Sequence, residues 1–505
     1  MKKIIAIVLA LVMTFALCAC GKAEPKQVAT GEKRTDLKVQ LAAEPTTLDF
    51  QAASVDATSL LAWNLNSNLL TYDLDGNIVG DLAEKWEYND DITEWTFMLR
   101  DGIKFSDGSE ITADDVVFSI NRGKEMAFNS YYEQIVSCEA VSDKEIKIVL
   151  SAPNSVFDRQ LAMDAFGILS KAYIEGGADL SSEAAVTSGP YYLAEWNAES
   201  DMLLKANEFY YAGIPAITDV DIVFIADQNT AMIALESNQV DYVVSILTAG
   251  DVENVKSADG IQLVDTNRTS YVMMCPNFLY EPFADANVRR AMNLAINRND
   301  FSALLGGLCT PAGPLDIQEG IGGYIEGYGK APVADIEKAK QYMQESGYPD
   351  GFEFELMTIA DYVQIAESIQ SQLKEIGITV NIKECADIST IDEAAVTGEY
   401  QGCIEILNNV IGDISGAGLI YDPDNILCLN HHTEGNEYGK ALTQCVAFDG
   451  DERVKMLEES YKMVEDLVPY IGCYYPILYN ACSADLNYGM QIPTSFARFA
   501  TMSWK

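Results

Sequence analysis

One stretch of the chain, residues 82–122, restricts the possible folds more than any other. Large apolar side chains stand at every second position from Trp95 to Leu99, as in a strand with one buried face. Asp101-Gly102 follows at once, and a second short alternation starts at Ile103. Because glycine-bearing turns commonly join paired strands, the pattern predicts a hairpin here.

A helix is predicted directly after that hairpin. Thr112 and Asp115, three residues further on, form a capping-box pattern, which marks the start of a helix. The apolar residues that follow fall on one helical face; they are Ala113, Val116, Val117 and Ile120. The stretch therefore predicts a β–β–α unit in a globular core.

The same stretch closely resembles the signature of the family 5 extracellular solute-binding proteins of bacterial ABC importers, the oligopeptide-, dipeptide- and nickel-binding group. That signature reads L-A-x-x-W, then W/Y-T-F-x-L-R, then G-x-K-F-x-D-G, then L-T-A-x-D-V-V-F-S. The matching positions are, in order, Leu82-Ala83, Trp86, Trp95-Thr96-Phe97, Leu99-Arg100, Gly102, Lys104-Phe105, Asp107-Gly108, Thr112-Ala113 and Asp115-Val116-Val117-Phe118-Ser119. Weaker blocks extend the resemblance from about Asp36 to the C-terminus.

The resemblance implies an α/β fold with the two-lobed architecture of periplasmic binding proteins. It implies type II, in the peptide-binding subclass with an extra domain, and a ligand cleft between the lobes. Carried onto this chain, it gives lobe 1 (domain I) at 36–70, 187–280 and 476–505, domain II at 71–186, and lobe 2 (domain III) at 281–475.

The residue pattern of the last part favours an α/β lobe independently. We predict a helix from Asp335 to Gly347, a strand over 352–356, a second helix ending at Gly377 and a strand over 378–382. Helices that alternate with strands in this way indicate an α/β lobe.

The first 19 residues have the pattern of a lipoprotein signal peptide. Two lysines precede an apolar run from Ile4 to Leu17, which is short for a membrane span. The run ends in Leu17-Cys18-Ala19-Cys20-Gly21, which resembles a bacterial lipobox. We therefore expect cleavage before Cys20, lipid on its sulfur, a flexible tether over 20–35, and anchoring at the outer face of the cell membrane, on the surface or in the periplasm. An ordinary secretory signal with an incidental cysteine is the alternative.

The charge balance limits the possible partners. The formal net charge is −43, which argues against nucleic acid as a partner and is permissive for cationic ligands. Because the acidic residues are spread along the chain, a solvated acidic surface explains most of them.

The cysteines do not indicate a disulfide framework. Of the 11 cysteines, Cys18 would leave with the signal peptide and Cys20 would carry lipid, and the nine that remain contain no C-x-x-C motif. Several stand among apolar neighbours and are expected to be small buried thiols; these are Cys138, Cys275, Cys403, Cys428 and Cys445.

The sequence gives no sign of catalysis or of a resident metal. It contains no G-x-S-x-G, G-x-x-x-x-G-K or H-E-x-x-H motif. His431 and His432 are the only histidines, so a catalytic dyad or a histidine-rich metal centre has little material. We expect a protein that is not an enzyme and holds no cofactor or metal.

The candidate ligand-binding residues come from the resemblance. In the peptide binders of the family, the aspartate of a W-x-x-D segment pairs with the α-ammonium of the peptide, and D-P-x-N follows. Here Gly412-Asp413 matches the end of that segment, Asp422-Pro423-Asp424-Asn425 matches the second landmark, and Val410 replaces the tryptophan. The loop Glu44-Pro45-Thr46 resembles the family's turn that lines the cleft. An ordinary aspartate in a glycine-rich loop is the alternative for Asp413.

The function implied is capture of short peptides outside the cell by a monomer that delivers them to a membrane permease and its ATPase. Extended peptides suit such a cleft because their main chain can be bound by hydrogen bonds while side chains occupy tolerant pockets. Three alternatives stay open: a non-peptide solute such as a nickel chelate, haem or an oligosaccharide; a surface receptor for a signalling peptide; and a surface-anchored hydrolase.

Overall fold

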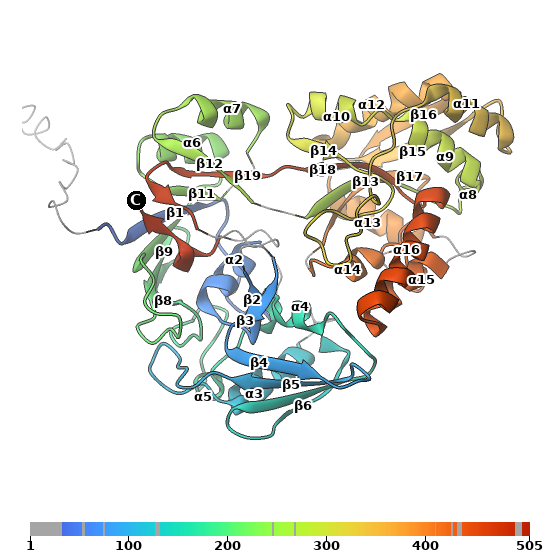
Figure 1. Cartoon of the computed structure of the whole chain (residues 1–505). Helices are drawn as coiled ribbons and strands as arrows, with labels where there is room; N and C mark the ends of the chain where they lie inside the picture. The colour runs from blue at the N-terminus through green and yellow to red at the C-terminus, as the bar shows by residue number, and fades with distance from the viewer. Residues whose placement is uncertain are drawn as a thin grey trace, which may run out of the picture.

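The chain folds into three parts, which are two α/β lobes and a smaller domain beneath them (Figure 1). The computed structural model describes residues 33–52, 56–73, 76–126, 132–244, 247–266, 269–409, 411–425, 428–431, 437–489 and 497–505. The predicted signal peptide, Cys20 and most of the predicted tether lie outside these residues.

Lobe 1 is built on a seven-stranded sheet in the order β12-β19-β11-β1-β10-β9-β8. Its strands are β1 (Asp36–Leu41), β8 (Tyr191–Asn197), β9 (Asp201–Ala206), β10 (Asp219–Phe224), β11 (Tyr242–Val244), β12 (Ile261–Asp265) and β19 (Tyr479–Ser483). One face packs on α2 (Asp56–Leu65) and the C-terminal segment with η6 (Phe499–Thr501), β20 (Leu486–Asn487) and β21 (Ser503–Trp504). The other face packs on α6 (Gln228–Glu236) and α7 (Ala249–Ser257).

Domain II is a four-stranded antiparallel sheet in the order β4-β5-β7-β6. Its strands are β4 (Ala83–Tyr88), β5 (Glu94–Leu99), β6 (Ile135–Ala140) and β7 (Glu145–Leu150). The helices of this part are α3 (Ala113–Glu125), α4 (Phe157–Leu161), η2 (Asp164–Phe166) and α5 (Lys171–Glu175), and the ribbon β2 (Leu70–Tyr72) with β3 (Ile78–Gly80) leads into it.

Lobe 2 is built on a six-stranded sheet in the order β14-β18-β13-β17-β15-β16. Its strands are β13 (Ser270–Pro276), β14 (Cys309–Pro311), β15 (Phe352–Thr358), β16 (Ile378–Glu384), β17 (Gly402–Asn408) and β18 (Ile471–Pro476). One face is covered by α8 (Glu281–Ala284), α9 (Ala286–Ala295), α10 (Asn299–Leu304), α11 (Ile336–Glu345), α12 (Val363–Leu373) and η4 (Lys374–Ile376), with η3 (Ala360–Tyr362) before α12. The other face is covered by α13 (Ile388–Thr397), α14 (Ile414–Gly418), α15 (Glu437–Gln444), η5 (Cys445–Ala447) and α16 (Gly450–Leu467).

Two neighbouring crossings join the two lobes. The chain passes from β12 of lobe 1 to β13 of lobe 2, and it returns from β18 to β19. Between the crossings, the Thr266 backbone N–H and its hydroxyl both donate to the Leu478 carbonyl oxygen, each at 3.0 Å. Because β13 pairs only within the lobe 2 sheet, the first crossing lies before Ser270 rather than at the predicted boundary of 280.

The local predictions for domain II are confirmed in part. Strand β5 buries Trp95, Phe97 and Leu99 on one face, and α3 starts at the predicted box, where the Thr112 backbone N–H donates to the Asp115 carboxylate at 3.0 Å. The predicted hairpin is wrong. Strand β5 pairs with β4 and β7, and the segment after Gly102 makes only the isolated bridge Lys104↔Glu110, because two longer strands occupy both edges of β5.

The predicted helix and strand alternation of lobe 2 is confirmed. Helix α11 is capped by Asp335, whose side chain accepts from the Lys338 backbone N–H, and β15 follows it. The second helix ends at Gly377, which has a φ of 86° that L side chains rarely adopt. Strand β16 then runs parallel to β15.

The buried face of β5 should carry much of the stability of domain II. Phe97 is fully buried, so Phe97→Ala should lower the free energy of unfolding of that domain by about 3–5 kcal/mol. Val136 of the same sheet is 59% exposed, so Val136→Ala should change it by less than about 0.5 kcal/mol. Urea denaturation followed by tryptophan fluorescence measures both, and equal midpoints would contradict the core position of Phe97.

Candidate ligand-binding site between the lobes

The predicted site loop follows β17, the strand that runs back toward the hinge. Ser270, the first residue of β13, pairs with Asn408 at the end of β17, so this loop begins beside the crossing. Asn409 then closes a turn, since its side-chain oxygen accepts from the Gly412 backbone N–H at 3.2 Å. Gly412 has a φ of 65°, which suits glycine at this bend. Val410 lies outside the described residues.

Asp413 is fully buried, and a cation from the same lobe already faces it. Its carboxylate accepts from Arg453 Nη2 at 2.7 and 2.9 Å and caps α14 by accepting from the Ser415 backbone N–H at 2.9 Å. Arg453 stands in the first turns of α16. The negative charge of Asp413 is therefore matched without a ligand, and pairing with a peptide ammonium stays a prediction that must include Arg453.

The Asp413 loop also touches domain II. Arg159 Nη1 donates to the Gly412 carbonyl oxygen at 3.2 Å, and the Tyr72 hydroxyl donates to the Ile411 carbonyl oxygen at 3.4 Å. The side chain of Ile411 packs in the core cluster of domain II. The loop therefore joins lobe 2 to domain II.

A second contact between domain II and lobe 2 lies at the start of α16. The Tyr88 hydroxyl donates to Asp449 Oδ2 at 2.6 Å, and the Ser155 backbone N–H donates to the Val446 carbonyl oxygen at 2.7 Å. The Tyr88–Asp449 bond raises the pKa of Tyr88 to about 12 and lowers the pKa of Asp449. Together with the Asp413 loop, these contacts form the edge where domain II meets lobe 2.

The other predicted site residues belong to lobe 1. Glu44 is half-buried, and its Oε1 accepts from Trp196 Nε1 at 2.6 Å and from the Glu199 backbone N–H at 3.2 Å. Pro45 is buried and Thr46 is exposed. Among the described hydrogen bonds and ion pairs, none joins this loop to the Asp413 loop, and the role of both in binding stays a prediction.

Three residues of this region were not predicted: Tyr72, Arg159 and Arg453. The sequence held one indication for Arg453: a basic side chain in the first turns of a helix is disfavoured by the helix dipole unless an acidic side chain pairs with it. Nothing in the sequence pointed to Tyr72 or Arg159, which act here through contacts made across the domains.

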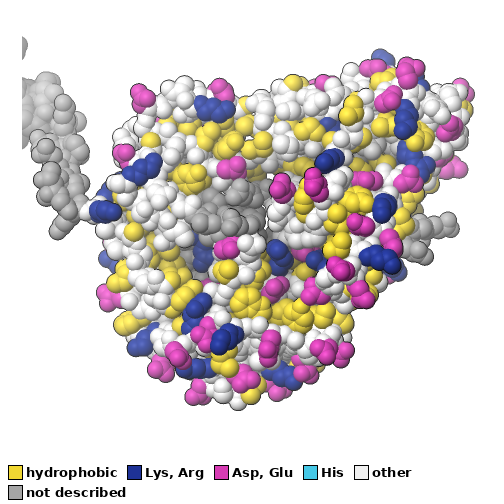
Figure 2. Space-filling model, in the orientation of Figure 1, with side chains coloured by type: hydrophobic (Ala, Val, Ile, Leu, Met, Phe, Trp, Pro, Cys, Tyr) yellow, Lys and Arg dark blue, Asp and Glu magenta, His cyan; other side chains and the backbone are white. Residues whose placement is uncertain are grey.

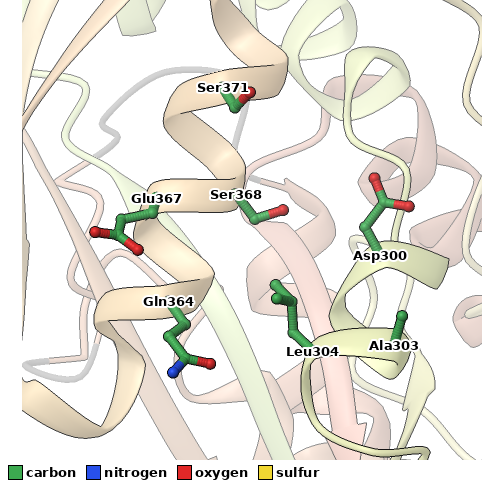
Figure 3. Close-up of a pocket in the computed structure, with 7 residues that line it drawn as sticks. All are labelled: Asp300, Ala303, Leu304, Gln364, Glu367, Ser368 and Ser371. Carbon is green, nitrogen blue, oxygen red and sulfur yellow. The ribbon is translucent and has the colours of Figure 1, made fainter.

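The surface is hollowed where lobe 1, domain II and lobe 2 meet (Figure 2). A separate shallow hollow lies between α10 and α12 on lobe 2, lined by Asp300, Ala303, Leu304, Gln364, Glu367, Ser368 and Ser371 (Figure 3). Because helices of the face opposite α14 line it, this hollow is distinct from the interlobe site.

The described residues contain no group of His, Cys, Asp and Glu side chains arranged to hold a metal ion. His431 Nε2 lies 2.6 Å from the Ala395 carbonyl oxygen, and His432 is outside the described part of the chain. The nine cysteines from Cys138 onward are free thiols; Cys385 is partly exposed and the others are buried, as expected for those named from the sequence. In the segments that the structure covers, no helix combines the length and apolarity of a membrane span.

Two α/β lobes joined by paired crossings, with a further domain that touches the far lobe, define a two-lobed solute-binding protein. Residues 77–416 match the family model described as bacterial extracellular solute-binding proteins, family 5 Middle, and the chain belongs to this family. It is therefore a solute-binding protein of the ABC-importer type.

The chain is also similar to a curated relative, and solved structures share its fold. The chain is 27% identical over 395 residues to the glutathione-binding protein GsiB of Escherichia coli K12, covering 76% of this chain and 75% of GsiB. HbpA2 of Haemophilus parasuis shares the fold with a TM-score of 0.84 and 21% identity, over 93% of this chain and 100% of HbpA2. DppA of Helicobacter pylori, in complex with the peptide STSA, shares it with a TM-score of 0.74 and 22% identity, over 93% and 98%.

The Asp413–Arg453 pair should be strongly coupled. Asp413→Asn leaves a buried guanidinium without its anion, which should cost about 3–5 kcal/mol of stability. Arg453→Met should cost a similar amount, and the double variant should lose less than the sum of the two single variants. Thermal melting measures each variant. Glu337→Gln, which removes the exposed Glu337–Lys340 pair, is the control and should cost under about 1 kcal/mol; additive losses at Asp413 and Arg453 would contradict the pairing.

Proposed function

We propose that the protein captures short peptides outside the cell and passes them to a membrane permease and its ATPase, while lipid on Cys20 holds it at the outer face of the membrane. The observation that carries the peptide assignment is the relative GsiB, which is named for binding glutathione, itself a tripeptide. DppA, which shares the fold, was solved with a four-residue peptide.

The geometry supports capture by closure. A ligand that touches both lobes changes the open–closed equilibrium by its difference in affinity for the two states. The Asp413 loop already touches domain II through Arg159 and Tyr72, so a ligand beside this loop would meet the edge that moves. We propose Asp413, Gly412 and the Glu44-Pro45-Thr46 loop as contacts, with Arg453 as a second charged group beside Asp413.

Binding of a nickel chelate is the second candidate within the family, and the residues disfavour it. The chain has two histidines, and the described one, His431, contacts a backbone carbonyl oxygen of α13. A receptor for a signalling peptide would use the same binding step and differs only in the partner that reads the closed form.

Short peptides should stabilise the protein and be recovered intact. Free peptide at 100 times its dissociation constant should add about 2.7 kcal/mol to the free energy of unfolding. A melting scan with di- to octapeptides measures this, and chromatography of the mixture shows whether the peptide survives. A shift with a sugar or a nickel chelate and none with peptides would contradict the peptide proposal, and cleaved peptide would favour the hydrolase alternative.

Anchoring should depend on Cys20 alone. Cys20→Ala removes the sulfur that would carry the lipid, so the protein should move from the membrane fraction to the medium or periplasm. Fractionation with immunoblotting measures this. Cys18→Ala is the matched control and should leave the protein in the membrane fraction, whereas retention of the Cys20→Ala variant there would contradict the proposal.

A further inference from the structure

A segment of lobe 2 between β14 and α11 is held in place by three tyrosine hydroxyls. Tyr271 donates to the Gly313 carbonyl oxygen at 2.8 Å, Tyr421 to that of Pro314 at 2.9 Å, and Tyr475 to that of Leu315 at 3.2 Å. In return, the Asp316 backbone N–H donates to the Tyr421 hydroxyl at 3.0 Å. The backbone around Asp316 is therefore held by bonds from β13, β18 and the loop after α14.

This segment lies between the hinge and the closing edge. Tyr271 is the second residue of β13, the strand that follows one crossing, and Tyr475 lies near the end of β18, just before the other. Further along, Gly322 forms a bridge with Asp413, whose loop touches domain II. The segment that carries Asp316 is therefore connected both to the strands beside the crossings and to the loop that contacts domain II.

The carboxylate of Asp316 lacks the partner that such a buried group requires. Asp316 is 4% exposed, and its Oδ2 is buried without a hydrogen-bond partner. The three tyrosine hydroxyls cannot supply one, because each donates its proton to a backbone carbonyl oxygen. Two other buried aspartates show the usual arrangement: Asp413 faces Arg453, and Asp49 faces Arg122.

We propose that Asp316 receives the positively charged group of the ligand, an ammonium or guanidinium, when the lobes close on it. This rests on the proposed function and identifies a specificity-determining residue for it. A buried carboxylate is costly unless a cation meets it, and within the described lobe no lysine or arginine forms an ion pair with Asp316. The cation can be the α-ammonium of a peptide or the side chain of Lys or Arg.

Two other buried acids carry an oxygen without a partner, and they support the choice of Asp316. Asp81 Oδ2 accepts from the Asn68 backbone N–H at 2.9 Å, and the charge of Arg498 acts on this carboxylate. Glu405 lies on β17, and the negative charge of Asp392 of α13 acts on its carboxylate. Three further residues of β17 separate Glu405 from the start of the Asp413 loop. Asp316 differs from both in that no charged partner among the described residues acts on its carboxylate, and its segment reaches the Asp413 loop through the bridge from Gly322.

Proton release should accompany binding at this site. Burial raises the pKa of Asp316 to about 7, and the groups that face it are the phenols of Tyr271, Tyr421 and Tyr475, whose pKa values burial also raises. Below pH 7 the free carboxyl is protonated and must lose its proton to pair with a cation. Affinity for cationic ligands should therefore fall about tenfold per pH unit below 7 and level off above it.

The test uses Asp316→Asn and three peptides. Tri-alanine carries only the α-ammonium, N-acetyl-Ala-Lys-Ala carries only a side-chain ammonium, and N-acetyl-tri-alanine carries neither. In calorimetric titration of the parent, the peptide whose ammonium pairs with Asp316, either tri-alanine or N-acetyl-Ala-Lys-Ala, should bind roughly 30-fold more weakly at pH 5.5 than at pH 8. Asp316→Asn should weaken that ligand roughly 100-fold at pH 8 and remove the pH dependence, with N-acetyl-tri-alanine unaffected. Asp300→Asn, an exposed acid of the same lobe, is the control and should match the parent.

A second measurement separates this inference from the peptide proposal. Because the folded pKa is raised, the ionised form destabilises the free protein as pH rises from about 4 to 7. The melting temperature of Asp316→Asn should therefore exceed that of the parent by a margin that grows over this range. If no peptide binds the parent, putrescine and arginine amide are titrated in their place. Binding of either compound that is lost in Asp316→Asn would support the role of Asp316 and contradict peptides as ligands. A variant that changes melting but binds every cationic probe as the parent does would overturn it.

Discussion

The two strand crossings are the constraint on which the rest of the structure depends. In the part of the chain that the structure describes, two adjacent segments connect lobe 1 with lobe 2, and the Leu478 carbonyl oxygen accepts two bonds from Thr266 between them. Two parallel connectors of this kind allow the lobes to rotate but not to separate, which is the geometry of hinge closure. The contacts between domain II and lobe 2 at the Asp413 loop and at Asp449 would then favour one angle between the lobes.

Buried charge sets a second constraint, and lobe 2 resolves it in two ways. Asp413 has its cation within the chain, so its charge is matched before any ligand arrives. Asp316 has none, so its environment is complete only when a cation or a proton occupies it. The free-energy cost of burying a carboxylate is thus offset by an ion pair at Asp413 and is left without a cation at Asp316. The Gly322–Asp413 bridge links the two segments.

Local patterns could be predicted from the sequence, and long-range pairing could not. The buried face of β5, the start of α3 at Thr112 and the alternation of α11, β15 and β16 follow from periodicity and caps, which act over a few residues. The hairpin prediction failed because the partners of β5 include β7, whose residues lie far along the chain and could not be weighed from turn residues alone. The first crossing was misplaced for the same reason, since only sheet pairing assigns β13 to lobe 2.

The candidate site shows the same limit more sharply. Asp413 could be named from its motif, yet its burial and its pairing with Arg453 depend on packing between elements 40 residues apart. Asp316 follows a proline and a leucine in a loop without periodicity, so no pattern separates it from the other acids of this chain. What distinguishes it is that the tyrosines around it direct their protons to the backbone. A charge requirement of that kind belongs to the folded arrangement, and a ligand that meets it would be selected by charge first and by side-chain shape second.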